Sequence, residues 1–158
     1  TLKRMDYSYI KASNTPAFMA YGSGSNQSIS DNVYEKVTVL NTELFDTDSA
    51  FASDRFTVPS GQDGKYYIFG TVRVDNGDGA IRNSSSAIYL NGSISILNNY
   101  DDQFEAHSRY LTFISIDGLL DLSAGDYVEL YNTTNINAGT SEIIANGSTR
   151  FGAYKILT

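Results

Sequence analysis

The residues of this chain that could do chemistry are a histidine and a few pairs of acids. His107 is the only histidine, and no Gly-x-Ser-x-Gly elbow accompanies it, so a serine–histidine–acid hydrolase is not indicated. A histidine-based metal site is disfavoured because one imidazole cannot supply the two or three that such sites use. The chain has no cysteine, which excludes disulfides and thiolate chemistry. His107 is therefore expected on the surface or at a contact between subunits.

The acids occur in three pairs, each in an expected turn: Asp46/Asp48, Asp75/Asp78 and Asp101/Asp102. Paired carboxylates can hydrolyse glycosides or hold calcium. Aspartate is also a favoured turn residue in its own right. Solvated turns are the preferred interpretation, calcium is the second and catalysis the third, so we predict no catalytic residue and no enzyme activity.

The element that organises the chain is a strand predicted over residues 64–74, between the turns Asp63-Gly64 and Asp75-Asn76-Gly77. Its second half alternates, with Val72 and Val74 on one face and Thr71 and Arg73 on the other. Its first half, residues 66–69, is aromatic or aliphatic on both faces. A strand that is apolar on both faces is covered on both faces. The second cover indicates another subunit, and hence an oligomer.

Other β-rich runs are separated by turn signals, and no helical periodicity is present. Strands are expected over residues 17–21, 35–40, 55–59, 109–116, 119–122, 127–131, 143–144 and 149–157. Asn91-Gly92 predicts a tight hairpin between residues 86–90 and 93–97. Residues 41–54 are expected to be mostly loop, and Asp117-Gly118 is expected to interrupt a strand. The fold class is therefore an all-β sandwich or jelly roll in one domain.

The charge of the chain is uneven. Its net charge of −7 disfavours a nucleic-acid partner, and no apolar run is long enough to span a membrane. Residues 1–15 carry Lys3, Arg4 and Lys11 against Asp6, a balance of +2 that leaves −9 on the remainder. We interpret residues 1–15, with Tyr7 and Tyr9, as a basic arm that docks on an acidic neighbour, and residues 16–158 as the folded body. The alternative is an ordinary disordered terminus.

Several short motifs follow one another in a specific order. They are Phe45-Asp46, Arg55–Pro59, Gly64–Phe69, the Asn91-Gly92 hairpin, Leu120–Leu122 with Gly125–Leu130, and Phe151–Tyr154. In this order they resemble the globular head of complement C1q and its tumour-necrosis-factor-like relatives, over about residues 16–157.

The resemblance implies a ten-stranded jelly roll that assembles as a homotrimer, with the first, central and last strands facing the threefold axis. The trimer-interface residues it implies are Tyr66, Tyr67, Phe69, Tyr127, Tyr131, Phe151 and Tyr154. The alternative is that these aromatics fill the core of a monomer. Some members of the family hold calcium near the top of the trimer, and the candidates here are Asp75, Asp78, Asp101 and Asp102. No other cofactor is expected.

The chain also departs from the family. Gly152 follows Phe151 one position early, Gln62-Asp63 lengthens a loop, and the collagen stem, cysteine and tryptophan common in animal relatives are missing. Together with loops rich in Ser, Asn and Thr, this resembles bacteriophage versions of the domain. The expected function is a non-enzymatic decoration or cement protein on the virion surface, docked on the major capsid protein. The alternatives are the receptor-binding head of a tail-fibre shaft, and a secreted lectin-like protein that binds a surface glycan.

Overall fold

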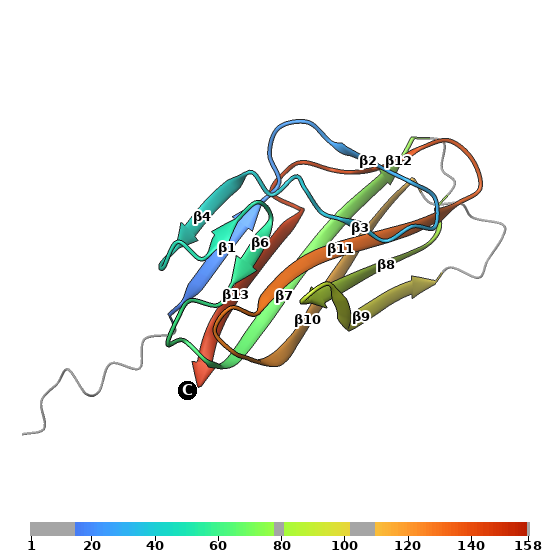
Figure 1. The fold of residues 1–158 in the computed structure, drawn as a ribbon. Coiled ribbons are helices and arrows are strands. Elements are labelled where there is room, and N and C mark those ends of the chain that lie inside the picture. Colours follow the sequence, from blue (N-terminus) through green and yellow to red (C-terminus); the bar gives the residue numbers. More distant parts are fainter. Residues whose placement is uncertain (1–14, 78–80, 102–109, 158) are drawn as a thin grey trace, which may run out of the picture.

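The computed structural model describes residues 15–77, 81–101 and 110–157, and within them the chain forms β-strands and no helix (Figure 1). In chain order the strands are β1 (Ala17–Tyr21), β2 (Gln27–Ile29), β3 (Glu35–Lys36), β4 (Thr42–Asp46), β5 (Phe51–Ala52), β6 (Arg55–Thr57), β7 (Gly64–Asn76), β8 (Ile81–Leu90), β9 (Ser93–Asp101), β10 (Leu111–Leu122), β11 (Tyr127–Ile136), β12 (Ser141–Ile143) and β13 (Arg150–Leu157). The described part of the chain has no helix able to cross a membrane.

The strands form two sheets packed face to face. The first sheet has the order β4-β1-β13-β7, with β10 on the other side of β7 and with β12 and β2 continuing from the far end of β7. The second sheet has the order β5-β6-β11-β8-β9, and β3 also pairs with β11. Within the described residues, the first sheet thus has seven strands and the second has six. The predicted all-β sandwich is thereby confirmed.

The central strand β7 and the Asn91-Gly92 hairpin lie where the sequence predicts them. Asn91 and Gly92 have φ angles of 51° and 81°, as a tight turn between β8 and β9 requires. Residues 41–54, predicted to be mostly loop, instead contain β4 and β5. In β4 the residues Glu43, Leu44 and Phe45 are all exposed, so no alternation marks the strand, and β5 has only two residues.

The predicted interruption at Asp117-Gly118 was wrong, because β10 runs unbroken through both residues. Gly118 faces the other sheet, where a Cβ added to it would lie 2.4 Å from the Cδ1 atom of Ile96. The glycine therefore allows a side chain of β9 to approach the backbone of β10, and it does not end the strand.

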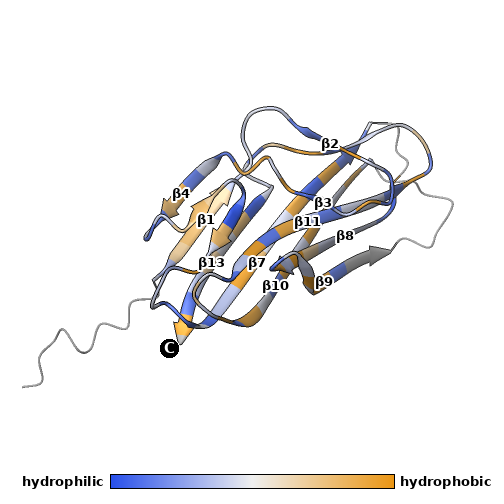
Figure 2. Cartoon of the chain, in the orientation of Figure 1, coloured by the Kyte–Doolittle hydropathy of each residue, from blue (hydrophilic) through white to orange (hydrophobic). Residues whose placement is uncertain are grey.

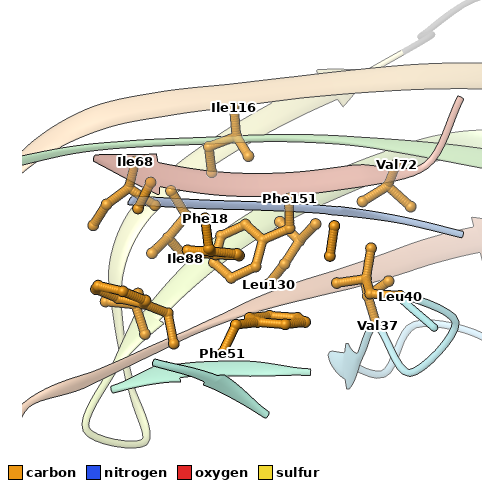
Figure 3. Packing of buried hydrophobic residues seen from close by; sticks show 14 of the residues in the cluster. Phe18, Val37, Leu40, Phe51, Ile68, Val72, Ile88, Ile116, Leu130 and Phe151 are labelled. Carbon is orange, nitrogen blue, oxygen red and sulfur yellow. The ribbon is translucent and has the colours of Figure 1, made fainter. Parts of the chain in front are cut away.

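Phenylalanine rings fill the space between β1 and β13 of one sheet and β5 and β6 of the other (Figure 3). Phe18 is 1% exposed. Its ring centroid lies 4.6 Å from that of Phe51 and 5.0 Å from that of Phe56, both stacked, and 5.2 Å from Phe151, edge-on. Phe18 is thus the centre of the aromatic core.

Another part of the interior is polar. Asn132 of β11 is fully buried, and its Nδ2 donates to the Ser85 carbonyl at 3.0 Å and the Ser84 hydroxyl at 3.2 Å. Its Oδ1 accepts from the Thr134 hydroxyl at 3.1 Å. Because every polar atom of this side chain has a partner, the network ties β8 to β11 at low cost.

Candidate functional site

The outer face of the first sheet, which points away from the core, carries large apolar side chains. Strand β7 alternates along its length, with Tyr66 and Ile68 buried in the core and Tyr67 and Phe69 half-buried on the outside. Cross-strand pairing places Tyr154 and Leu119 on either side of Tyr67, and Gly152 beside Phe69. Met19 pairs with Gly152, and Phe45 pairs with Met19. We call these outward residues the aromatic face: Met19, Phe45, Tyr67, Phe69, Leu119 and Tyr154.

The rings of the aromatic face contact one another. The ring centroid of Tyr67 lies 5.5 Å from that of Tyr154 and 5.9 Å from that of Phe69. A Cβ added to Gly152 would lie 2.5 Å from the tip of the Phe69 ring, so this glycine makes the space over which the ring lies. Partial burial raises the pKa of the Tyr67 phenol, and its hydrogen bond with Asp117 and the charge of that carboxylate raise it further. The phenol therefore stays neutral well above neutral pH.

The aromatic face is open to solvent in the single chain. Phe45 is 44% exposed and Leu119 is 64% exposed. In Figure 2 the strands of this sheet carry strongly hydrophobic residues. Polar pairs bound the face along β7: Lys65 meets Asp121 at 2.7 Å on one side, and the hydroxyls of Thr71 and Ser115 lie 3.2 Å apart on the other. Asp117 of β10 also points outward, opposite Phe69, so one carboxylate lies within the face. An apolar patch with a polar rim is typical of a protein–protein interface.

A second exposed apolar area lies at the side of the sandwich. Ile94 and Leu97 of β9, the edge strand of the second sheet, are exposed, and so is Phe113 of β10. The side-chain amide of Asn98 donates to the Ser115 carbonyl and links β9 to β10. We call Ile94, Leu97 and Phe113 the apolar edge.

Two of the predicted interface residues lie inside the core. Tyr66 and Phe151 are 0% exposed, because they occupy the inward positions of β7 and β13. The Tyr66 hydroxyl donates to the Gln62 carbonyl, which explains how a tyrosine is accommodated there. Neither side chain can contact another subunit, so their assignment to the interface was wrong.

Tyr127 and Tyr131 lie on β11 of the second sheet, so the structure does not bring them together with the aromatic face. The Arg55 guanidinium covers the Tyr127 ring at 3.9 Å, and the Tyr131 ring stacks on Tyr89 at 3.8 Å. Their contacts belong to the outer face of that sheet, on the opposite side of the sandwich from Tyr67, so they do not lie together with Tyr67, Phe69 and Tyr154. Their place at a trimer interface stays a prediction.

A buried carboxylate holds the elements around Tyr127 and Tyr131 together. The side chain of Glu129, 4% exposed, accepts hydrogen bonds from Lys36 Nζ at 2.8 Å and Arg55 Nε at 2.9 Å. Burial raises the pKa of Glu129, but these two cations outweigh it, so the net pKa is lowered and the carboxylate stays charged. The pairs fix β3 and β6 on β11, which is a structural role.

The calcium candidates are only partly within the described residues. Asp75 lies on the outer face of β7, opposite Glu142 of β12. Asp101 is the last residue of β9, while Asp78 and Asp102 lie outside the described residues. No group of three or more acids, histidines or cysteines that could hold a metal occurs among residues 15–77, 81–101 and 110–157. Calcium binding therefore stays a prediction. His107 and the arm residues Lys3, Arg4, Tyr7, Tyr9 and Lys11 also lie outside the described residues.

Sequence reasoning missed Met19, Phe45 and Leu119. The signal for Leu119 was present, because a continuous β10 in register with β7 places it beside Tyr67. Met19 follows from the alternation of β1, in which Phe18 and Ala20 are buried. Phe45 could not be found, because its strand was interpreted as a loop.

The fold resembles that of two solved structures, although the sequence alone matches nothing. No family model matches the chain, and no curated protein matches it by sequence. Among solved structures, the globular domain of zebrafish complement 1qA protein matches with a TM-score of 0.59 and 16% identity, over 90% of this chain and 98% of that one. The Eiger TNF from S. frugiperda matches with a TM-score of 0.62 and 15% identity, over 89% of this chain and 91% of that one. The chain therefore has a C1q/TNF-like jelly-roll fold.

Proposed function

We propose that this chain is a non-enzymatic structural or binding domain that works as a homotrimer closed through the aromatic face. The observation that carries the proposal is the face itself, where half-buried rings and an exposed Leu119 and Phe45 lie together inside a polar rim. Covering such a patch removes apolar area from water, which stabilises the covered state by about 25 cal/mol per Å² of apolar area buried. A second copy of the same chain is the partner that we propose to cover the aromatic face.

The same chain offers a complementary surface. The apolar edge differs from the aromatic face in position and composition, so a contact between them is head-to-tail. Head-to-tail contacts close into rings when the rotation between copies allows it. A ring of three is the number that the resemblance to C1q and tumour-necrosis-factor domains implies.

The native mass of the purified chain tests this proposal. Light scattering on a sizing column at moderate salt is expected to give three times the 17.3 kDa chain mass. A single-chain mass would mean that the aromatic face stays open in solution, and would contradict the homotrimer.

Within this class we propose a place on the surface of a bacteriophage particle, as a decoration protein whose basic arm docks on the major capsid protein. The support is the uneven charge, with +2 on residues 1–15 and −9 on the rest, and the loop composition. A fibre head would be present in few copies at the tail, whereas a decoration protein covers the capsid, so the number of copies per particle separates these two roles.

Removing residues 1–15 is expected to abolish attachment to the capsid while leaving the trimer intact. The reason is that the arm, and not the jelly roll, carries the basic side chains proposed to contact the acidic neighbour. Co-sedimentation of the variant with stripped capsids measures attachment, and light scattering measures the trimer. A full-length control with Lys3, Arg4 and Lys11 changed to Gln separates charge from length. Undiminished attachment of the truncated chain would refute the role of the arm.

One observation favours the lectin-like alternative. The rings of Tyr34 and Tyr89 lie 6.3 Å apart, and Tyr89 stacks on Tyr131, all on the outer side of the second sheet. A trimer built on the aromatic face would leave these rings open to a sugar. Saturable glycan binding that is lost on Tyr89→Ala would support that alternative.

A further inference from the structure

The guanidinium of Arg73, on the outer face of the first sheet, has a buried nitrogen without a hydrogen-bond partner among the described residues. Arg73 points outward from β7, two outward positions beyond Phe69, and its side chain is 27% exposed. The nitrogen without a partner is Nε. One NH2 group lies 3.9 Å from the Asp75 carboxylate, beyond hydrogen-bond distance, and the guanidinium lies 5.8 Å from the centre of the Phe113 ring. A buried guanidinium donor without an acceptor is costly, and it needs an explanation.

An open pocket of about 380 Å³ lies next to Arg73 on the same face, lined by Asn26, Asp75, Gly77, Thr140, Glu142 and Ile144. Asp75 and Glu142 are directly opposite each other across β7 and β12. Like charges at such positions destabilise a sheet. The Asn26 amide donates to Glu142 at 3.1 Å, and Arg73 of the same chain stays 3.9 Å from Asp75. The pocket therefore has the charge and the room for a further cationic group.

We propose that Arg73 of one copy enters the Asp75–Glu142 pocket of the next copy, so that three identical arginine–carboxylate contacts close the trimer above the aromatic face. Each chain carries one donor and one acceptor on the same sheet face, so a threefold ring uses each of them once. A guanidinium can bind two carboxylate oxygens at once, and it keeps its charge when it is buried.

This proposal rests on the proposed homotrimer and adds how its copies are aligned with one another. The aromatic face supplies apolar contact, which several rotations of one copy against another would satisfy. Only one of these rotations brings the two partners of a charge pair together, since the other alignments leave buried charges unpaired. The contact of Arg73 with Asp75 and Glu142 thus determines how the copies are aligned in the trimer.

Reversing the charge at residue 73 tests the proposal. Arg73→Glu is expected to weaken trimer formation by about a hundredfold or more, as breaking a buried charge pair does. Arg82→Glu is the matched control, because Arg82 is an exposed arginine on β8 of the second sheet, away from the aromatic face and the Asp75–Glu142 pocket. Sedimentation velocity over a dilution series measures the association, and circular dichroism checks that each variant folds. A trimer of unchanged affinity with Arg73→Glu would overturn the contact but leave the homotrimer standing.

Cysteine cross-linking gives a second test that does not depend on affinity. The chain has no cysteine of its own, so the single variants Arg73→Cys and Glu142→Cys each carry one thiol and cannot form an internal disulfide. When the two variants are refolded together, mild oxidation is expected to yield a covalent dimer on a non-reducing denaturing gel, which neither variant gives alone. Single-chain product from the mixture would overturn the proposal. If the wild-type chain is a monomer by light scattering, the proposed homotrimer fails first, so the two failures are distinguishable.

Discussion

On the proposed homotrimer, a chain that carries Phe69→Asp is expected to elute as a single folded chain, under conditions where the wild type is expected to elute as three. Phe69 points outward from β7, and its ring lies over Gly152 and beside Tyr67. Burying a phenylalanine side chain contributes about 1.5–3 kcal/mol, and a carboxylate buried in its place without a partner costs further free energy. Since the change is repeated in each of three contacts, we expect complete dissociation at roughly micromolar concentration. Light scattering on a sizing column measures the mass.

The fold of this variant should survive, because Phe69 takes no part in the core between the sheets. A far-ultraviolet circular dichroism spectrum like that of the wild type would confirm this. Val33→Asp is the control, since Val33 is an exposed apolar residue that lies outside the aromatic face and the apolar edge. An intact trimer with Phe69→Asp would place the interface on another surface of the molecule.

The second large effect is expected from Phe18→Ala, which should lower the free energy of unfolding by about 3–5 kcal/mol. The ring of Phe18 contacts those of Phe51, Phe56 and Phe151, so its removal leaves a cavity that three other rings cannot readily fill. A loss of this size is a large part of the stability of an ordinary domain. Urea unfolding followed by circular dichroism measures it.

The measurement should be made in the Phe69→Asp background, because association would otherwise add to the apparent stability. Phe45→Ala in the same background is the control. It removes the same atoms from an exposed position of the neighbouring strand, and we expect a cost of less than about 1 kcal/mol. Equal costs at residues 18 and 45 would contradict the core described here.

The sequence predicted the fold well, because the strongest signals are local. The Asn91-Gly92 turn and the aromatic run of β7 both have direct physical causes in single residues. It was harder to predict which side chains of β7 point into the core and which point outward. Residues 66–69 are all apolar, but the alternation of Val72 and Val74 extends backward to Ile68 and Tyr66, which are the buried ones. That extension would have removed Tyr66 from the predicted interface.

Residues on different sheets cannot be grouped from their types alone. Tyr127 and Tyr131 share the aromatic character of Tyr67 and Tyr154, yet the pairing of β11 with β8 places them on the other sheet. Strand pairing depends on contacts distant in the sequence. For the same reason the sequence did not indicate the pocket beside Arg73. Asp75 and Glu142 lie opposite each other only because β12 pairs with the end of β7.

The buried amide of Asn132 has a consequence for how the chain avoids wrong pairings. Its bonds to Ser84 and Ser85 cross from β11 to β8, so they depend on how these two strands are aligned, whereas its bond to Thr134 lies within β11. A shift by two residues keeps the same faces inward, and an apolar interior would tolerate it. Here that shift would break the bonds that cross to β8 and would move the buried amide away from its partners there. The buried amide of Asn132 therefore favours the native alignment of β8 with β11 over the shifted ones.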